Sequence, residues 1–190
     1  MLEPRIQQQF FESADLHYQA AEVLGRPIEQ AAAALVAVLT GGGKLLVAGP
    51  GPCASLAALA AGALLGGFER ERPGLAAIAL AVEGADGAST PLARQVDTLG
   101  QPGDLLLLID TDGQHPALLA ALAAAQAKDM TVIALTGRQG GALRAALGET
   151  DVLVAVPHER RARVLETQLL VLHCLCDAID LQLLGEQDPA

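Results

Sequence analysis

Short apolar segments alternate with longer alanine- and leucine-rich segments along most of this chain. The short segments predict β-strands near 44–48, 76–82, 104–109, 130–136 and 151–156, and two of them are the continuous apolar runs typical of strands buried on both faces. The segments between and after them predict helices at 53–65, 90–98, 116–127, 140–147 and 159–184. This alternation predicts an α/β fold, a three-layer αβα sandwich around a five-stranded parallel sheet.

Two further helices are expected before the first strand. Residues 2–24 have helical periodicity, Arg26–Pro27 breaks the pattern, and a second helix over about 28–40 ends at a run of glycines. The apolar surface of these helices and of the last helix is larger than the surface needed to cover one small sheet. We therefore expect residues 1–190 to form a single domain, with the helices within residues 1–41 involved in oligomerisation.

Composition narrows the class of protein. At 190 residues and 52% hydrophobic but only 2% aromatic, the chain must build its core from Ala, Leu and Val. A net charge of −10 argues against a direct nucleic-acid surface, and the alanine–leucine runs are too short to span a membrane. Three cysteines do not form a disulfide framework, and the N-terminus has no signal-peptide pattern. These features favour a cytoplasmic protein.

Two turns mark a candidate ligand site. Each follows a buried strand and opens a helix, whose first N–H groups and positive dipole end suit an anion. The candidate ligand-loop residues are Gly49, Gly51, Cys53, Asp110, Thr111, Asp112 and Gly113.

The two aspartates argue against a phosphate in that site. A carboxylate ~5 Å from a phosphate charge costs about 3 kcal/mol at an effective dielectric of about 20. We therefore expect weak or no phosphosugar binding. The aspartates would instead cap the turn and the following helix, with a neutral or cationic ligand as the alternative.

Several stretches resemble the SIS (sugar isomerase) domain family, and most specifically its phosphoheptose isomerase and DiaA-like branch. The matching stretches are Phe68–Leu80, Leu99–Asp104, Val132–Arg138 and, in the last helix, Ala162–Val164 and His173–Asp180. The resemblance covers nearly the whole chain and implies a flavodoxin-like SIS fold with a phosphosugar-binding site.

The functional motifs depart from that family. The serine of the first loop is Cys53, and the second loop keeps only Thr111 and Gly113. The resemblance also implies a zinc site, but its histidine, glutamate and glutamine positions hold Leu59, Ala63 and Leu165, so we expect no metal and no cofactor. The segment 83–89 is shorter than its counterpart in the family.

Few groups remain for catalysis. Isomerisation needs a positioned acid and base, and the remnants of the family's site are Glu166 and His173. Glu166 follows Arg163 at helical spacing, so a charge pair is an equally good interpretation.

These losses favour a non-catalytic, DiaA-like scaffold, expected to be a homotetramer. The resemblance suggests the replication initiator DnaA as its partner, bound through Leu183 and Leu184 at the end of the last helix; packing between subunits is the alternative role for these leucines. The alternative function is a phosphosugar isomerase or phosphosugar-binding protein related to sedoheptulose 7-phosphate isomerase.

Overall fold

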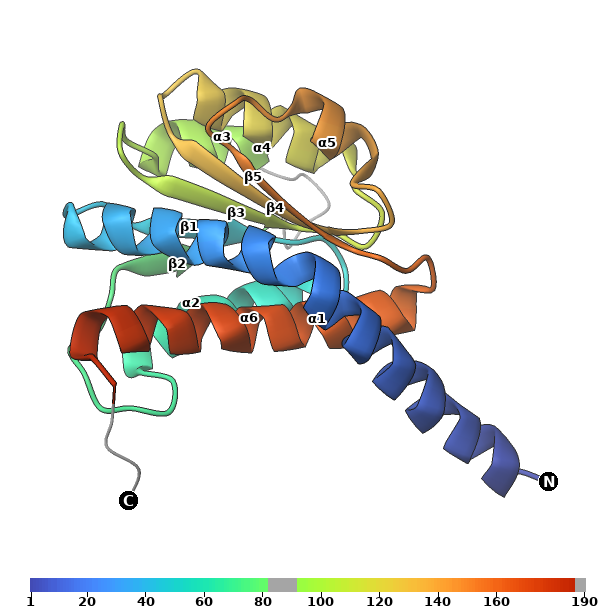
Figure 1. Ribbon diagram of the computed structural model, residues 1–190. Helices are drawn as coiled ribbons and strands as arrows, with labels where there is room; N and C mark the ends of the chain where they lie inside the picture. Colours follow the sequence, from blue (N-terminus) through green and yellow to red (C-terminus); the bar gives the residue numbers. More distant parts are fainter. Residues whose placement is uncertain (82–91, 187–190) are drawn as a thin grey trace.

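A computed structural model describes residues 1–81 and 92–186 and contains the expected parallel sheet (Figure 1). Its strands are β1 (Leu45–Ala48), β2 (Ala77–Ala79), β3 (Leu105–Ile109), β4 (Thr131–Gly137) and β5 (Val152–Val156). They are all parallel and lie in the order β2-β1-β3-β4-β5. The predicted α/β fold with a five-stranded parallel sheet is therefore confirmed.

Helices cover both faces of this sheet. On one face lie α1 (Glu3–Thr40), α2 (Cys53–Gly66) and α6 (Arg161–Leu184); on the other lie α3 (Leu92–Leu99), α4 (Pro116–Gln126) and α5 (Gly141–Ala146). Successive strand residues point to opposite faces. In β3, Leu105 and Leu107 join the first core, whereas Leu106 and Leu108 join the second. This is why the strands read as continuous apolar runs.

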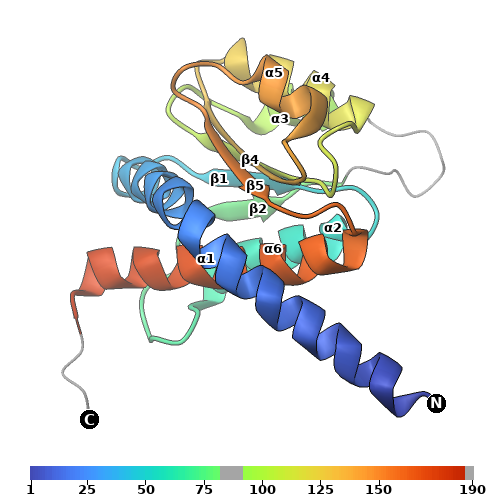
Figure 2. The ribbon, with the colours of Figure 1, turned by 45° about the vertical axis from the view of Figure 1, so that its right-hand side comes forward.

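The prediction of two N-terminal helices is wrong, because α1 is one continuous helix with Pro27 inside it. Its buried residues recur at helical spacing on both sides of the proline and form one stripe, which packs mainly on α6 and β5: Leu16, Ala20, Leu24, Ala31, Ala32 and Leu35. This burial outweighs the hydrogen bond that proline cannot donate. Figure 2 shows the N-terminal half of α1 extending beyond the body of the domain.

The remaining boundaries differ in detail. The strand expected over 76–82 is limited to Ala77–Ala79, and the helix expected from residue 90 is described from Leu92. The last helix begins at Arg161 rather than 159, and α5 at Gly141 rather than 140. The short segment 83–89 lies outside the described residues.

Candidate functional site

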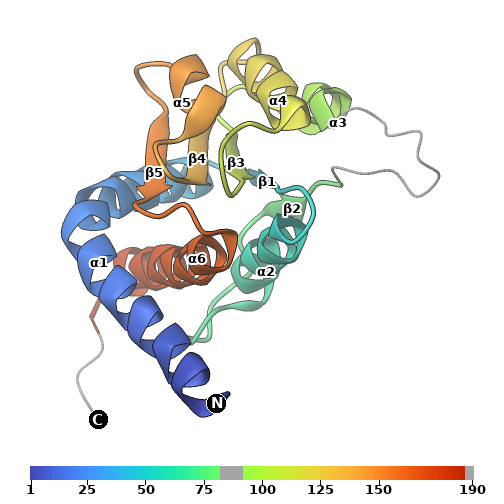
Figure 3. The same cartoon turned by 90° about the vertical axis from the view of Figure 1, so that its right-hand side faces the viewer.

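The loops after β1 and β3 meet at the carboxyl edge of the sheet. These strands are neighbours, but α2 and α4, which follow them, cover opposite faces. Parallel α/β sheets bind ligands at such a point, where the strand order reverses. Figure 3 faces this edge and shows α2 and α6 on the same side of the sheet.

A cavity of about 430 Å³ lies between the two loops. Residues from the first loop, the second loop and the start of α6 line it: Pro50, Gly51, Pro52, Cys53, Asp110, Thr111, Asp112, Gln114, His115, Pro116 and Arg161. Five of the seven predicted ligand-loop residues are among them. The other two, Gly49 and Gly113, do not line the cavity but shape the loops that do.

The buried carboxylate of Asp110 fills the anion-binding turn after β3. It accepts hydrogen bonds from the backbone N–H groups of Thr111 (2.8 Å), Gln114 (3.1 Å) and His115 (3.3 Å). Asp112 accepts a further bond from the Gln114 N–H at 3.0 Å. These hydrogen bonds show that the two aspartates cap the turn, but not the following helix, because α4 has His115 as its N-cap residue and no side-chain cap hydrogen bond. Three N–H groups of the turn, those of Thr111, Gln114 and His115, thus already bind a side chain of the protein.

Packing fixes the position of this turn. The buried Gln168 of α6 donates to the carbonyl oxygens of Asp110 (2.6 Å) and Leu135 (3.2 Å), which ties α6 to the ends of β3 and β4. Gly113 has a φ of +71°, and a Cβ there would clash with the carbonyl of Gly140. Only glycine suits such a position.

The loop after β1 offers few donors to a ligand. Pro50 and Pro52 have no N–H, and the N–H groups of Cys53 and Ala54 are bonded to Pro50 and Gly51 carbonyls at 3.0 Å. Gly49 packs against Cys53 so closely that an added Cβ would lie 2.6 Å from the Cys53 Cβ. The turn is thus closed on itself.

Cys53 lies buried at the start of α2, in the wall of the cavity. Burial, reinforced by the charge of Asp110, raises the pKa of its thiol to about 12, although Arg161 acts in the opposite direction. The thiol is therefore protonated near neutral pH and is a poor nucleophile.

Among the cavity-lining residues that were not predicted as site residues, His115 and Arg161 carry ionisable side chains. The buried Nδ1 atom of His115 has no hydrogen-bond partner among the described residues. Arg161 is exposed at the first position of α6. The sequence places Arg161 in a basic cluster, but fifty residues separate it from the second loop, so periodicity alone could not bring the two together.

The residues at the positions of the family's zinc site do not fit a metal. Leu59 and Ala63 on α2 and Leu165 on α6 have no donor atoms, and Leu165 packs against the core. The fourth residue, His173, has its ring 5.3 Å from that of Phe68. Among the described residues, no three His, Cys, Asp or Glu side chains gather in a metal-binding group. The expectation of a metal-free protein stays a prediction.

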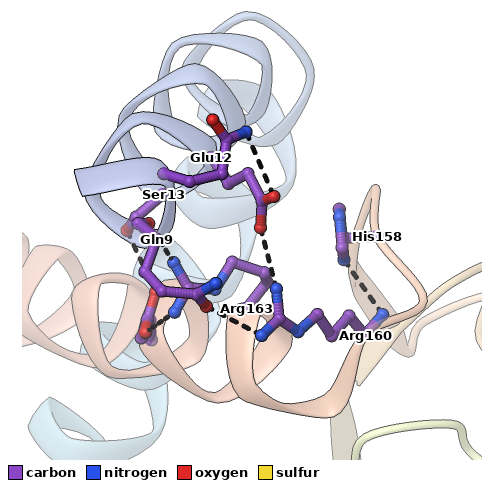
Figure 4. Close-up of polar contacts among 8 residues, drawn as sticks. Gln9, Glu12, Ser13, His158, Arg160 and Arg163 are labelled. Atoms are coloured by element: carbon purple, nitrogen blue, oxygen red, sulfur yellow. Dashed lines mark hydrogen bonds and ion pairs between the residues drawn. The ribbon is translucent and has the colours of Figure 1, made fainter. Parts of the chain in front are cut away.

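Glu166 and His173, the two predicted catalytic remnants, do not line the cavity. Glu166 pairs with Arg163 and accepts a hydrogen bond from Ser13 at 3.0 Å, in a network between α1 and α6 that Figure 4 shows in part. Arg163 also donates to the Gln9 carbonyl at 2.7 Å. The charge-pair interpretation of Glu166 is therefore the one the geometry supports.

The predicted partner-binding leucines have different environments. Leu183 packs against the core, whereas Leu184 is 41% exposed. The two side chains therefore do not form a common exposed apolar anchor.

Comparison with known proteins identifies the family. The model of the SIS domain matches residues 9–137, and the chain belongs to that family. It is 56% identical to a phosphoheptose isomerase of Methylibium petroleiphilum, covering 99% of this chain and 98% of that relative. A phosphoheptose isomerase of Thiobacillus denitrificans is 46% identical over 98% of this chain and 99% of its own.

Solved structures agree with this assignment. Phosphoheptose isomerase GmhA of Neisseria gonorrhoeae superposes with a TM-score of 0.86 at 38% identity, over 95% of this chain and 99% of its own. A phosphoheptose isomerase of Francisella tularensis superposes with a TM-score of 0.88 at 39% identity, over 95% of this chain and 98% of that structure's chain.

These relatives correct the functional prediction. The expected non-catalytic scaffold for DnaA is wrong, because full-length relatives at 43–56% identity are phosphoheptose isomerases. The chain belongs to the phosphoheptose isomerase branch of the SIS family. The prediction of a scaffold gave the lost zinc-site residues more weight than the similarity of the whole chain.

Proposed function

We propose that this chain isomerises a phosphorylated sugar of the phosphoheptose class, such as sedoheptulose 7-phosphate, in the cavity between the loops after β1 and β3. The full-length similarity to phosphoheptose isomerases carries the proposal. The position of the cavity, where the strand order reverses, supports it independently.

The reaction needs proton transfers and no oxidant. A base removes the proton from the carbon beside the carbonyl, and an enediol forms. A proton then returns to the former carbonyl carbon, while a hydroxyl proton moves between the two oxygens. Catalysis therefore requires groups that accept and donate protons within reach of adjacent carbons.

Two cavity residues suit these roles. His115 lines the cavity, and an imidazole can act as a general acid or base. Asp112 is exposed, and one of its carboxylate oxygens has no hydrogen-bond partner among the described residues, so it is the candidate second group. Asp110 is held by three N–H groups and has a positioning role. No step is assigned to a metal, because the zinc-site positions do not fit one.

The test is a coupled assay of sedoheptulose 7-phosphate isomerisation. We expect turnover by the wild type and a fall in kcat of about 10²-fold or more in His115→Gln, the usual effect of removing a general acid or base. His158→Gln is the matched control, since His158 lies outside the cavity and accepts a bond from the Arg160 N–H. Absence of wild-type turnover would refute the proposal, and equal rates in the two variants would refute the role of His115.

A further inference from the structure

We infer that the guanidinium of Arg161, with the imidazole of His115, binds the phosphate group of the substrate in place of the backbone cradle after β3. The inference rests on the proposed function for the identity of the sugar. The recognition of phosphate can be tested without it.

Many of the backbone N–H groups in the loops after β3 and β1 are already bonded or missing. After β3, the Asp110 carboxylate occupies the N–H groups of Thr111, Gln114 and His115. After β1, two prolines lack N–H groups and the next two N–H groups are bonded within the turn. Five backbone N–H groups of these loops are thus already bonded, which favours a phosphate held through side chains.

Arg161 differs from the neighbouring arginines, Arg160 and Arg163, in having no ion-pair partner among the described residues. Arg160 pairs with Glu12 at 2.8 Å and donates to the Gln9 side chain at 2.7 Å. Arg163 pairs with Glu166 and turns toward α1 as well, as Figure 4 shows for both arginines. Arg161 has no hydrogen bond or ion pair among the described residues, and it lines the cavity.

Two carboxylates, those of Asp110 and Asp112, also line the cavity. Asp110 accepts hydrogen bonds from three N–H groups of the turn before α4. Asp112 is exposed to solvent and holds one N–H group, so water screens its charge. Arg161 is thus a cationic side chain of the cavity that forms no ion pair with either carboxylate.

The chemistry of these groups fits a phosphate monoester. A guanidinium presents a planar fork of donors that matches two phosphate oxygens. His115 also lines the cavity, and a ring N–H can donate a further bond to a phosphate oxygen. The Arg161 side chain projects from the first turn of α6, where the helix dipole also favours an anion.

The test compares Arg161→Gln with Arg160→Gln. The second variant is the control, because it removes the same charge from the neighbouring residue, whose side chain is already paired with Glu12. Isothermal titration is run with three probes: inorganic phosphate, sedoheptulose 7-phosphate and unphosphorylated sedoheptulose. We expect Arg161→Gln to weaken the binding of inorganic phosphate and of sedoheptulose 7-phosphate by about tenfold or more. Arg160→Gln should change the affinity for these two probes little. Arg161→Lys should restore part of the loss, since it keeps the charge without the fork.

The outcomes distinguish this inference from the proposed function. Unchanged phosphate affinity in Arg161→Gln, equal losses in the two variants, or no phosphate binding by the wild type would overturn the inference. If phosphate binding depends on Arg161 while the wild type shows no turnover, the proposed isomerase fails and the anion site stands. If turnover occurs with no dependence of KM on Arg161, the isomerase stands and the anion site fails.

Discussion

At the scale of single residues, Asp110 determines what the loop after β3 can bind. Its carboxylate is the anion at the start of α4, where three backbone N–H groups meet. Sequence reasoning indicated that the aspartates cap this turn. The particular N–H groups could not be predicted, because they depend on the loop conformation set by Gly113 and Gln168.

Vacating the turn should improve phosphosugar binding. We expect the double variant Asp110→Ser with Asp112→Ser to bind a sugar phosphate more tightly, by up to about 3 kcal/mol, because it removes two negative charges and frees N–H donors. Titration of both proteins with sedoheptulose 7-phosphate measures this. The exposed Asp177→Ser on α6 is the control for net charge. Unchanged or weaker binding by the double variant would contradict the electrostatic argument.

Asp104 should make stability depend on pH. Burial raises the pKa of its carboxyl, but hydrogen bonds from Lys44 and the Gln101 N–H outweigh burial and hold the pKa below its ordinary value. A carboxyl with a lowered folded-state pKa stabilises the fold above its unfolded pKa, about 3.9. That stability is lost as pH falls through the folded pKa.

Denaturant unfolding from pH 6 down to pH 2 tests this. The wild type should lose stability below about pH 4, and Asp104→Asn should be less stable near neutral pH and lose less on acidification. Parallel curves for the two proteins would show that Asp104 contributes nothing to the acid sensitivity.

At the scale of elements, strands buried on both faces were predicted better than the N-terminal helix. Strands such as 104–109 are buried on both faces, so their sequence alone carries the signal. The break predicted at Arg26–Pro27 was wrong, because the tertiary packing of one stripe along α1 overrides a local signal. The position of Arg161 in the cavity could not be predicted, because only the folded sheet brings the start of α6 beside the loops after β1 and β3.

A buried ion pair joins the segment before β2 to α6. Arg72 and Asp180 are joined at 2.5 Å with side chains 1% and 2% exposed, and Arg72 also donates to the Leu64 carbonyl at the end of α2. Asp180→Asn leaves a buried, uncompensated guanidinium. We expect it to lower the free energy of unfolding by about 3–5 kcal/mol in urea titrations.

Asp97→Asn is the control for this pair. It breaks an ion pair with Lys128 in which Asp97 is 74% exposed, and exposed pairs contribute at most about 1 kcal/mol. A loss in Asp180→Asn no larger than in this control would show that the buried pair does not hold α6.

At the scale of the whole molecule, α1 leaves an apolar surface uncovered. Phe10, Phe11 and Tyr18 are 72%, 62% and 78% exposed on its projecting half. By length and composition alone α1 could also cross a membrane. Its buried stripe instead packs on α6 and the sheet, and we propose that the exposed face of its N-terminal half contacts other copies of the chain.

The expected assembly is a homotetramer. Light scattering at micromolar concentration should give four times the 19.4 kDa of one chain. Phe10→Ser with Phe11→Ser should give smaller species that keep their helical signal, because these side chains are not part of the domain core. A monomeric wild type would contradict the prediction, as would a double variant of unchanged mass.

The most direct test of the account is the initial rate of sedoheptulose 7-phosphate isomerisation by the purified protein after exhaustive chelation. We expect turnover to persist at the rate seen before chelation, because the proposed proton-transferring groups are His115 and Asp112. The zinc-site positions hold Leu59, Ala63 and Leu165. No turnover with or without added zinc would contradict an isomerase in this cavity. Turnover that appears only with zinc would contradict the assignment of its chemistry to these residues.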